Sequence, residues 1–173
     1  LGRSRASSTP ADNDARMDGL LWDRATAAAA RQLPLVSPAR AGLFAARLAL
    51  QTNAPDAAER VAALGAAADA DPGLVVDRAR WLRDRAQGVE ARALLARQRR
   101  FTAPPLDAGA WLTTYFTIAQ QAEHDNQATL AFDIASQADS AFLSGTDIRA
   151  RPLAERGPYT SLVWVGAQTA LEK

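Results

Sequence analysis

Apolar residues recur along this chain at helical spacing, in segments separated by short breaks. Alanine, leucine and arginine dominate the sequence and all favour helix. The one clear β-branched doublet, Val75–Val76, lies within a helical segment. The clearest apolar stripe alternates by three and four residues and comprises Val75, Ala79, Leu82, Ala86, Val89, Ala93 and Ala96. The pattern therefore predicts an all-α protein.

Proline, glycine and polar clusters divide this pattern into about eight helices. We expect Gly88 to mark a turn within the clearest stripe, and Ser37 and Asp107 to cap the helices that follow them. The stretch Leu143–Tyr159, which contains two glycines and two prolines, predicts a long loop. The helices are expected over about 14–32, after Pro38, after Pro55, over 75–96 in two parts, over 107–125, over 127–141, and from about 160 to the end.

Helices joined mostly by short breaks are typical of stacked antiparallel hairpins. Trp22, Trp81 and Trp111 are expected in the first turns of helices, with small residues about one helix later, as in tetratricopeptide-type repeats. The predicted fold is therefore all-α, with stacked antiparallel helical hairpins forming a superhelical, tetratricopeptide-like array. Residues 1–14 are predicted to be a flexible N-terminal segment and residues 15–173 a single α-superhelical domain.

Composition narrows the possible functions. Hydrophobic residues make up 48% and charged residues 23% of the chain, as in ordinary globular proteins, and the net charge is +1. So weak a charge argues against nucleic acid as a partner. No run of about 18 apolar residues occurs, so no membrane span is predicted. The absence of cysteine excludes disulfides, thiolate metal sites and a cysteine nucleophile.

The sequence predicts no catalytic, metal or cofactor site. His124, the only histidine, lies in a polar turn between two predicted helices and cannot build a histidine-rich metal site. Neither a nucleophile elbow nor a glycine-rich phosphate loop is present. Most acids stand near arginines, as Asp77 does near Arg80, which indicates solvated faces with weak ion pairs. A pair of carboxylates in a cleft stays open as an alternative, because it needs no fixed spacing.

Arginine clusters supply the candidate ligand contacts. The cluster at 78–85 is interleaved with acids, and the cluster at 97–100 is expected at a helix C-terminus, where cations are favoured anyway. The third cluster occupies the predicted long loop, and such loops are often functional. The candidate ligand-binding residues are Arg149, Arg151, Arg156 and Tyr159.

Several strings of residues, in this order, also resemble a known pattern. They are L-L-W-D-R-A-T at 20–26, L-P-L-V-S-P-A-R at 33–40, R-L-A-L-Q at 47–51, G-L-V-V-D-R-A-R-W-L-R-D-R at 73–85, A-F-D-I-A at 131–135, and G-T-D-I-R-A-R-P-L-A-E-R-G-P-Y-T-S-L-V-W at 145–164. The ordered set resembles the helical, non-catalytic part of soluble lytic murein transglycosylases over roughly Met17–Leu171.

This resemblance implies a periplasmic protein that acts on peptidoglycan. Enzymes of the family cleave the bond between N-acetylmuramic acid and N-acetylglucosamine without water, and one glutamate serves as acid and then base. That glutamate lies in a separate lysozyme-like domain and is followed by serine. Here the glutamates at 59, 90, 123, 155 and 172 are followed by Arg, Ala, His, Arg and Lys. The chain is therefore expected to match the scaffold without the part that performs the chemistry.

Two classes of function follow. The first is a scaffold whose partners are peptidoglycan glycan strands, a catalytic lysozyme-like domain, or other cell-wall proteins. The second is a tetratricopeptide-like adaptor that binds proteins and has no role at the cell wall; a helical enzyme with an unrecognised carboxylate pair ranks third. The residues 171–173 fall within a helical pattern, which suggests that the segment belongs to a larger chain, although a stand-alone scaffold remains the alternative.

Overall fold

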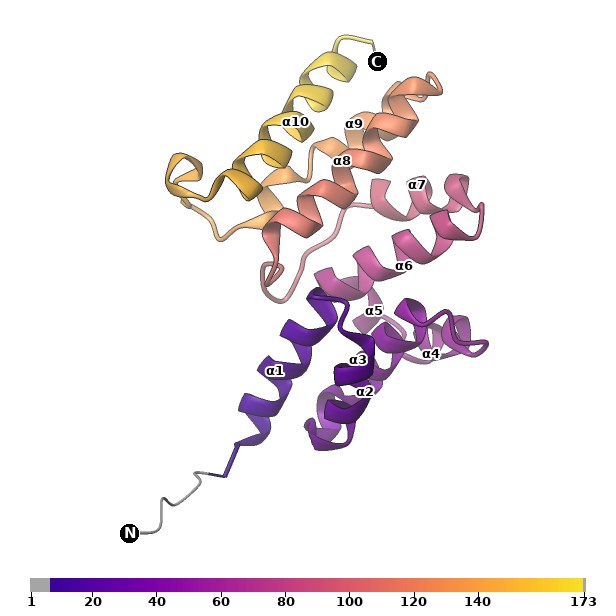
Figure 1. Ribbon diagram of the computed structural model, residues 1–173. Coiled ribbons are helices and arrows are strands. Elements are labelled where there is room, and N and C mark those ends of the chain that lie inside the picture. Colours follow the sequence, from indigo (N-terminus) through magenta and orange to yellow (C-terminus); the bar gives the residue numbers. More distant parts are fainter. Residues whose placement is uncertain (1–6, 173) are drawn as a thin grey trace. The chain divides into compact units, whose positions relative to one another are not determined.

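A computed structural model describes residues 7–172 of the chain (Figure 1). These residues form ten α-helices and three short 3₁₀ helices, with no strand among them, which confirms the all-α class. They fall into two compact units, one that ends at Leu64 and one that begins at Gly65. The sequence had instead predicted one domain from residue 15 onward.

The first unit contains four α-helices and one 3₁₀ helix. They are α1 (Pro10–Trp22), α2 (Thr26–Gln32), η1 (Leu33–Leu35), α3 (Pro38–Gln51) and α4 (Ala57–Ala63). Thr9 caps α1 in a capping box: its hydroxyl accepts from the Asp12 amide at 3.1 Å, and the Asp12 carboxylate accepts from the Thr9 amide at 3.0 Å. Residues 10–14 of the predicted flexible segment 1–14 belong to α1, and residues 1–6 lie outside the described part.

The second unit contains six α-helices and two 3₁₀ helices. They are α5 (Ala67–Ala70), α6 (Pro72–Asp84), α7 (Gly88–Ala96), α8 (Ala108–His124), α9 (Ala128–Ala135), η2 (Ala138–Ala141), η3 (Ile148–Ala150) and α10 (Leu153–Ala170). Here α8, α9 and α10 pack side by side, and α6 and α7 pack against each other (Figure 1). As predicted, the stripe over 75–96 is divided between two helices, α6 and α7. The predicted cap at Asp107 is also confirmed, because its carboxylate accepts from the Ala110 amide at 2.9 Å.

One turn recurs after the longer helix of each pair. It places a residue in the left-handed region after α1, α3, α6 and α8: Arg24 (φ 55°), Asn53 (φ 53°), Ala86 (φ 60°) and Asn126 (φ 59°). After α6, the Gln87 amide donates to the Leu82 carbonyl at 2.9 Å and the Ala86 amide to Arg83 at 3.1 Å, which is a Schellman motif. The same two bonds close the other three turns. A shorter helix follows each time: α2, α4, α7 and α9.

This recurring turn corrects the first predicted helix. The segment 14–32 is two helices rather than one, because the chain turns at Arg24. The expected side-chain cap at Ser37 is also wrong. Its hydroxyl donates to the Asp14 carboxylate at 2.6 Å and its amide donates to the same carboxylate at 2.8 Å, so Ser37 ties the start of α3 to α1.

The predicted loop Leu143–Tyr159 is wrong over its second half, since α10 begins at Leu153 and runs through Pro158. Proline has no amide to donate to the carbonyl of Ala154, four residues earlier. That carbonyl lies against Gly109 at the start of α8, where an added Cβ would be 2.8 Å from its oxygen. A glycine on α8 therefore makes room for the exposed backbone of α10.

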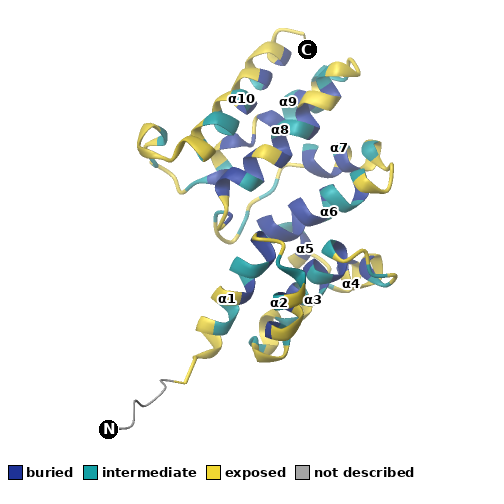
Figure 2. Cartoon of the chain, viewed as in Figure 1, coloured by how far each residue is buried: buried dark blue, intermediate teal, exposed yellow. Residues whose placement is uncertain are grey.

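Each unit has its own core, seen as the dark blue faces in Figure 2. In the first unit Met17, Leu21, Ala29 and Phe44 are fully buried. In the second, Trp111 stacks on Tyr115 with ring centroids 3.9 Å apart. Trp111 is the one tryptophan of the predicted three that lies in a first helical turn, because Trp22 ends α1 and Trp81 lies in the last turn of α6.

Candidate functional site

The four predicted ligand residues lie around the start of α10 but do not form one cluster. Arg149 lies on η3 and Arg156 in the first turns of α10, both exposed. Arg151 binds Glu155 through two contacts of 2.6 and 3.0 Å, and its guanidinium lies over the Phe142 ring, 5.5 Å from the centroid. The hydrogen bond to Glu155 raises the pKa of Arg151. This arginine is therefore neutralised locally.

Tyr159 also contacts Phe142. Its hydroxyl donates to Asp139 at 2.8 Å, which raises the pKa of Tyr159, and its ring centroid is 6.0 Å from that of Phe142. A hollow of about 460 Å³ opens beside it, with Tyr159 in its wall. Within the described residues, no hydrogen bond or ion pair joins the side chain of Arg149 or Arg156 to this group. The structure therefore brings together Arg151 and Tyr159 only.

A groove between α8 and α10 was not predicted. It has a volume of about 440 Å³ and is lined by Phe116, Gln120 and Glu123 from α8 and by Thr160, Ser161, Trp164, Val165 and Gln168 from α10. Trp164 is 64% exposed, whereas Trp111 is fully buried. An indole held open to solvent beside amide, hydroxyl and carboxylate groups gives the groove one apolar contact surface and several hydrogen-bonding groups. We name it the Trp164 groove.

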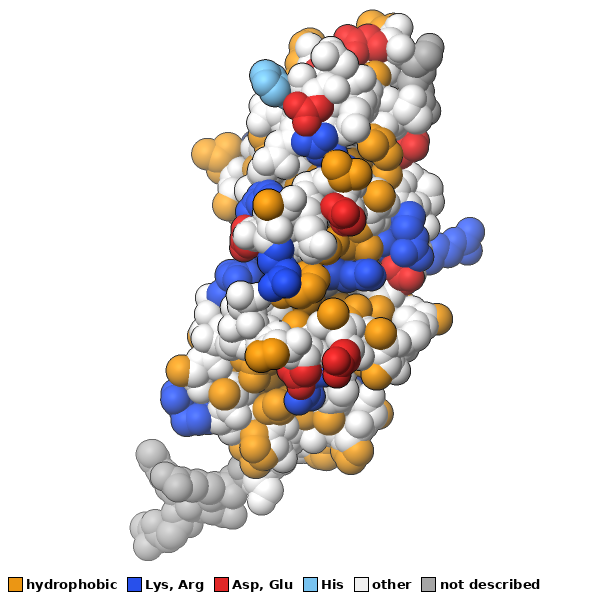
Figure 3. Space-filling model, turned by 90° about the vertical axis from the view of Figure 1, so that its right-hand side faces the viewer, with side chains coloured by type: hydrophobic (Ala, Val, Ile, Leu, Met, Phe, Trp, Pro, Cys, Tyr) orange, Lys and Arg blue, Asp and Glu red, His pale blue; other side chains and the backbone are white. Residues whose placement is uncertain are grey.

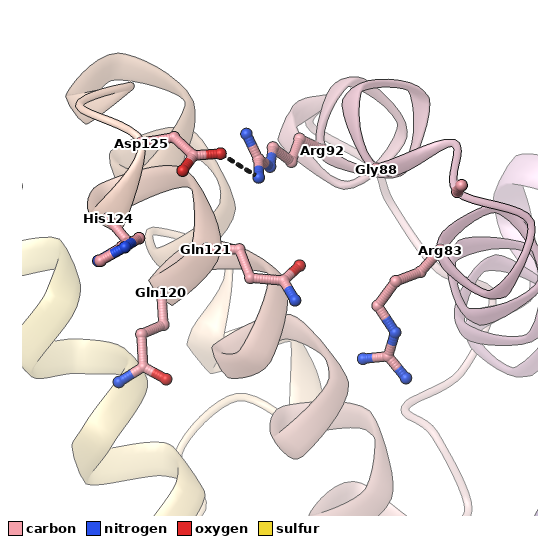
Figure 4. A pocket seen from close by; sticks show the side chains of 8 residues that line it. Arg83, Gly88, Arg92, Gln120, Gln121, His124 and Asp125 are labelled. Carbon is pink, nitrogen blue, oxygen red and sulfur yellow. Dashed lines mark ion pairs between the residues drawn. The ribbon is translucent and has the colours of Figure 1, made fainter.

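A second hollow, of about 550 Å³, lies between the α6–α7 turn and the C-terminal half of α8 (Figure 4). Its lining comprises Arg83, Ala86, Gly88, Arg92, Gln120, Gln121, His124 and Asp125. Arg92 pairs with Asp125 at 2.6 Å and donates to Gln127 at 2.7 Å. The histidine predicted to lie in a polar turn is the last residue of α8 and is exposed. We name this hollow the Arg83 pocket.

Charges elsewhere are mostly balanced, and acidic side chains lie among the basic ones on the face drawn in Figure 3. Arg97 and Arg99 both bind Asp69, at 2.8 and 3.0 Å. Burial alone would raise the pKa of Asp69, but its hydrogen bonds and charge contacts with the two arginines outweigh burial and lower that pKa. The second arginine cluster is therefore partly neutralised by one carboxylate.

The acids show one exception to the predicted solvated faces. Asp77 is only 4% exposed, so that interpretation is wrong for this residue. Among residues 7–172, no three histidine or acidic side chains come close enough together to hold a metal ion. No helix in the described part is both long enough and apolar enough to cross a bilayer.

Comparison with known proteins assigns the chain to no family. No model of a protein family, no curated protein and no solved structure matches the chain.

Proposed function

We propose that this chain is the non-catalytic α-superhelical scaffold of a soluble lytic murein transglycosylase-like protein in the periplasm, and that it binds peptidoglycan glycan strands. In this account it positions a strand for a lysozyme-like catalytic domain. The ordered strings from Leu20 to Trp164 support the family. The observation that carries glycan binding is the exposed Trp164 in its groove.

The scaffold part of the proposal is supported by the recurring helix pairs. The four pairs α1–α2, α3–α4, α6–α7 and α8–α9 each join a longer helix to a shorter one through the same left-handed turn. Repeated units of this kind stack because no single unit can bury its apolar face alone. We propose that these pairs are the repeats of a superhelical, tetratricopeptide-like array.

Glycan binding is supported by the chemistry of the Trp164 groove. A pyranose ring has an apolar face of C–H groups and an equatorial rim of hydroxyl and acetamido groups. Trp164 offers a rigid apolar plane that loses little conformational entropy on binding. Gln120, Gln168 and Ser161 offer donors and acceptors around it. Small-molecule sites generally combine an apolar wall with a few polar groups that fix orientation.

A pelleting experiment with isolated peptidoglycan sacculi tests the proposal. Trp164→Ala is expected to weaken saturable binding about tenfold, or about 1.4 kcal/mol. Leu171→Ala is the matched control, because Leu171 is an apolar residue just after α10, 89% exposed and outside the groove. Equal binding by wild type and Trp164→Ala contradicts the assignment of the groove. No binding by the wild-type chain favours the adaptor that binds proteins instead.

A further inference from the structure

We infer that the Arg83 pocket binds a carboxylate group, held between the Arg83 guanidinium and the Gln121 carboxamide. This inference goes beyond the proposed function and stands without it, because it rests on the donors of one pocket. Arg83 extends from α6 and Gln121 extends toward it from α8, so two sets of N–H donors face one open space (Figure 4). A planar guanidinium matches a carboxylate through paired hydrogen bonds.

The donors of Arg83 are largely uncommitted. Its one ion pair within the described residues is long, 3.9 Å to the adjacent Asp84, and that aspartate is 67% exposed. The Arg83 side chain is itself only 34% exposed, so part of its hydration is already lost. Such a cation gains more from a bound anion than a fully solvated arginine does.

The charge of the pocket selects a monoanion. Arg92 is nearby, but Asp125 and Gln127 occupy its two terminal nitrogens at 2.6 and 2.7 Å. Arg83, whose ion pair with Asp84 is long at 3.9 Å, is therefore the guanidinium left for a ligand, and its single charge matches one carboxylate better than a phosphate dianion. The same Arg92 contacts also hold α7 to the end of α8, so the two walls of the pocket are fixed before a ligand arrives.

The pocket adjoins the Trp164 groove at one residue. Gln120 lines both hollows, and in Figure 4 its side chain points away from Arg83. A sugar that carries a carboxylate-bearing arm could therefore contact Trp164 and Arg83 together. This extension, unlike the carboxylate site, rests on the proposed function.

Titration of the full chain with N-acetylalanine, followed by ¹H–¹⁵N NMR, tests the site. We expect the side-chain amide signals of Gln121 to shift saturably with N-acetylalanine and not with its uncharged amide. Arg83→Gln should weaken this binding about tenfold or more. Gln121→Leu, followed through the backbone amide signals of the residues that line the pocket, should weaken it in a second, independent variant. Arg149→Gln, which removes an exposed arginine outside the pocket, should leave the binding unchanged.

Three results would overturn the inference. They are equal binding of the acid and the amide, unchanged binding by a folded Arg83→Gln protein, and tighter binding of inorganic phosphate than of N-acetylalanine. The experiments distinguish a failure of the carboxylate site from a failure of the proposed glycan binding. Trp164→Ala affects sacculus binding, whereas Arg83→Gln affects the small carboxylate.

Discussion

The two units contain the same left-handed turn but use their polar side chains differently. In the first unit, groups along α1 bind the next helices: Asp14 binds Ser37, Asp18 binds Arg47 at 2.8 Å, and the Leu21 carbonyl accepts from Gln51 at 2.8 Å. In the second unit, α8 is buried by apolar packing between α6–α7 and α9–α10. Thr114 near its middle accepts from Arg80 at 3.1 Å, and Gln120 and Gln121 near its C-terminal end line open hollows.

This difference explains where ligand sites can form. Polar groups that already bind one another inside a unit contribute to stability and have little to offer a ligand. Groups that the fold leaves open, such as Trp164 and the Arg83 guanidinium, can exchange water for a ligand instead. The polar contacts of α1 therefore have a structural role, whereas the surface of α8 and α10 is where we propose that ligands bind.

The largest expected effect comes from breaking the α1 contacts at Arg47. This side chain is fully buried, pairs with Asp18, and lies over the Trp22 ring at 5.2 Å. Arg47→Ala should destabilise the first unit by about 3–5 kcal/mol, because it removes one partner of a largely buried pair and leaves a cavity. Residue-resolved hydrogen exchange should show the loss of protection in α1 and α3. Arg31→Ala, at an exposed position, is the control. An equally mild effect of both variants would contradict the structural role of Arg47.

A smaller effect is expected in the second unit at Gly109. A Cβ there would lie 2.8 Å from the Ala154 carbonyl oxygen, so Gly109→Ala must push α8 from α10 and should cost about 1–3 kcal/mol. Gly157→Ala is a matched control within α10, because nothing lies within 4 Å of its added Cβ. That control should be neutral or stabilising by up to about 1 kcal/mol. Urea denaturation measures the free energy of unfolding of both variants. Equal values would show that the close approach of Gly109 to the Ala154 carbonyl is unimportant for stability.

The smallest expected effect concerns the shared turn. Ala86 holds a left-handed conformation (φ 60°) that costs an L-residue about 1 kcal/mol relative to glycine. Ala86→Gly should therefore stabilise the second unit by roughly 0.5–1 kcal/mol. Ala93→Gly, at an exposed position inside α7, should destabilise it by about 1 kcal/mol. Thermal unfolding should show a higher melting temperature for Ala86→Gly and a lower one for Ala93→Gly. If both substitutions lower the melting temperature, Ala86 is not strained in this turn.

Local signals predicted much of this fold, and contacts between distant residues explain what they missed. Asp107 was recognisable as a cap from its position alone. The turn at Arg24 contains no glycine or proline, so no residue there indicates that the first helix divides. The loop predicted across Pro158 is wrong because Gly109, nearly fifty residues away along the chain, makes room for the backbone of α10. The Trp164 groove and the Arg83 pocket both join residues of separate helices, which no spacing along the chain can reveal.

The most direct test of the account uses the tryptophan indole signals of the full chain during titration with a soluble N-acetylglucosamine oligomer. Trp22 reports on the first unit, Trp111 on the core of the second, and Trp164 on the groove. If a glycan binds the groove, the Trp164 signal should shift saturably while the Trp22 and Trp111 signals stay in place. A shift confined to Trp22, or no shift of any indole signal, would contradict a glycan site on α8 and α10.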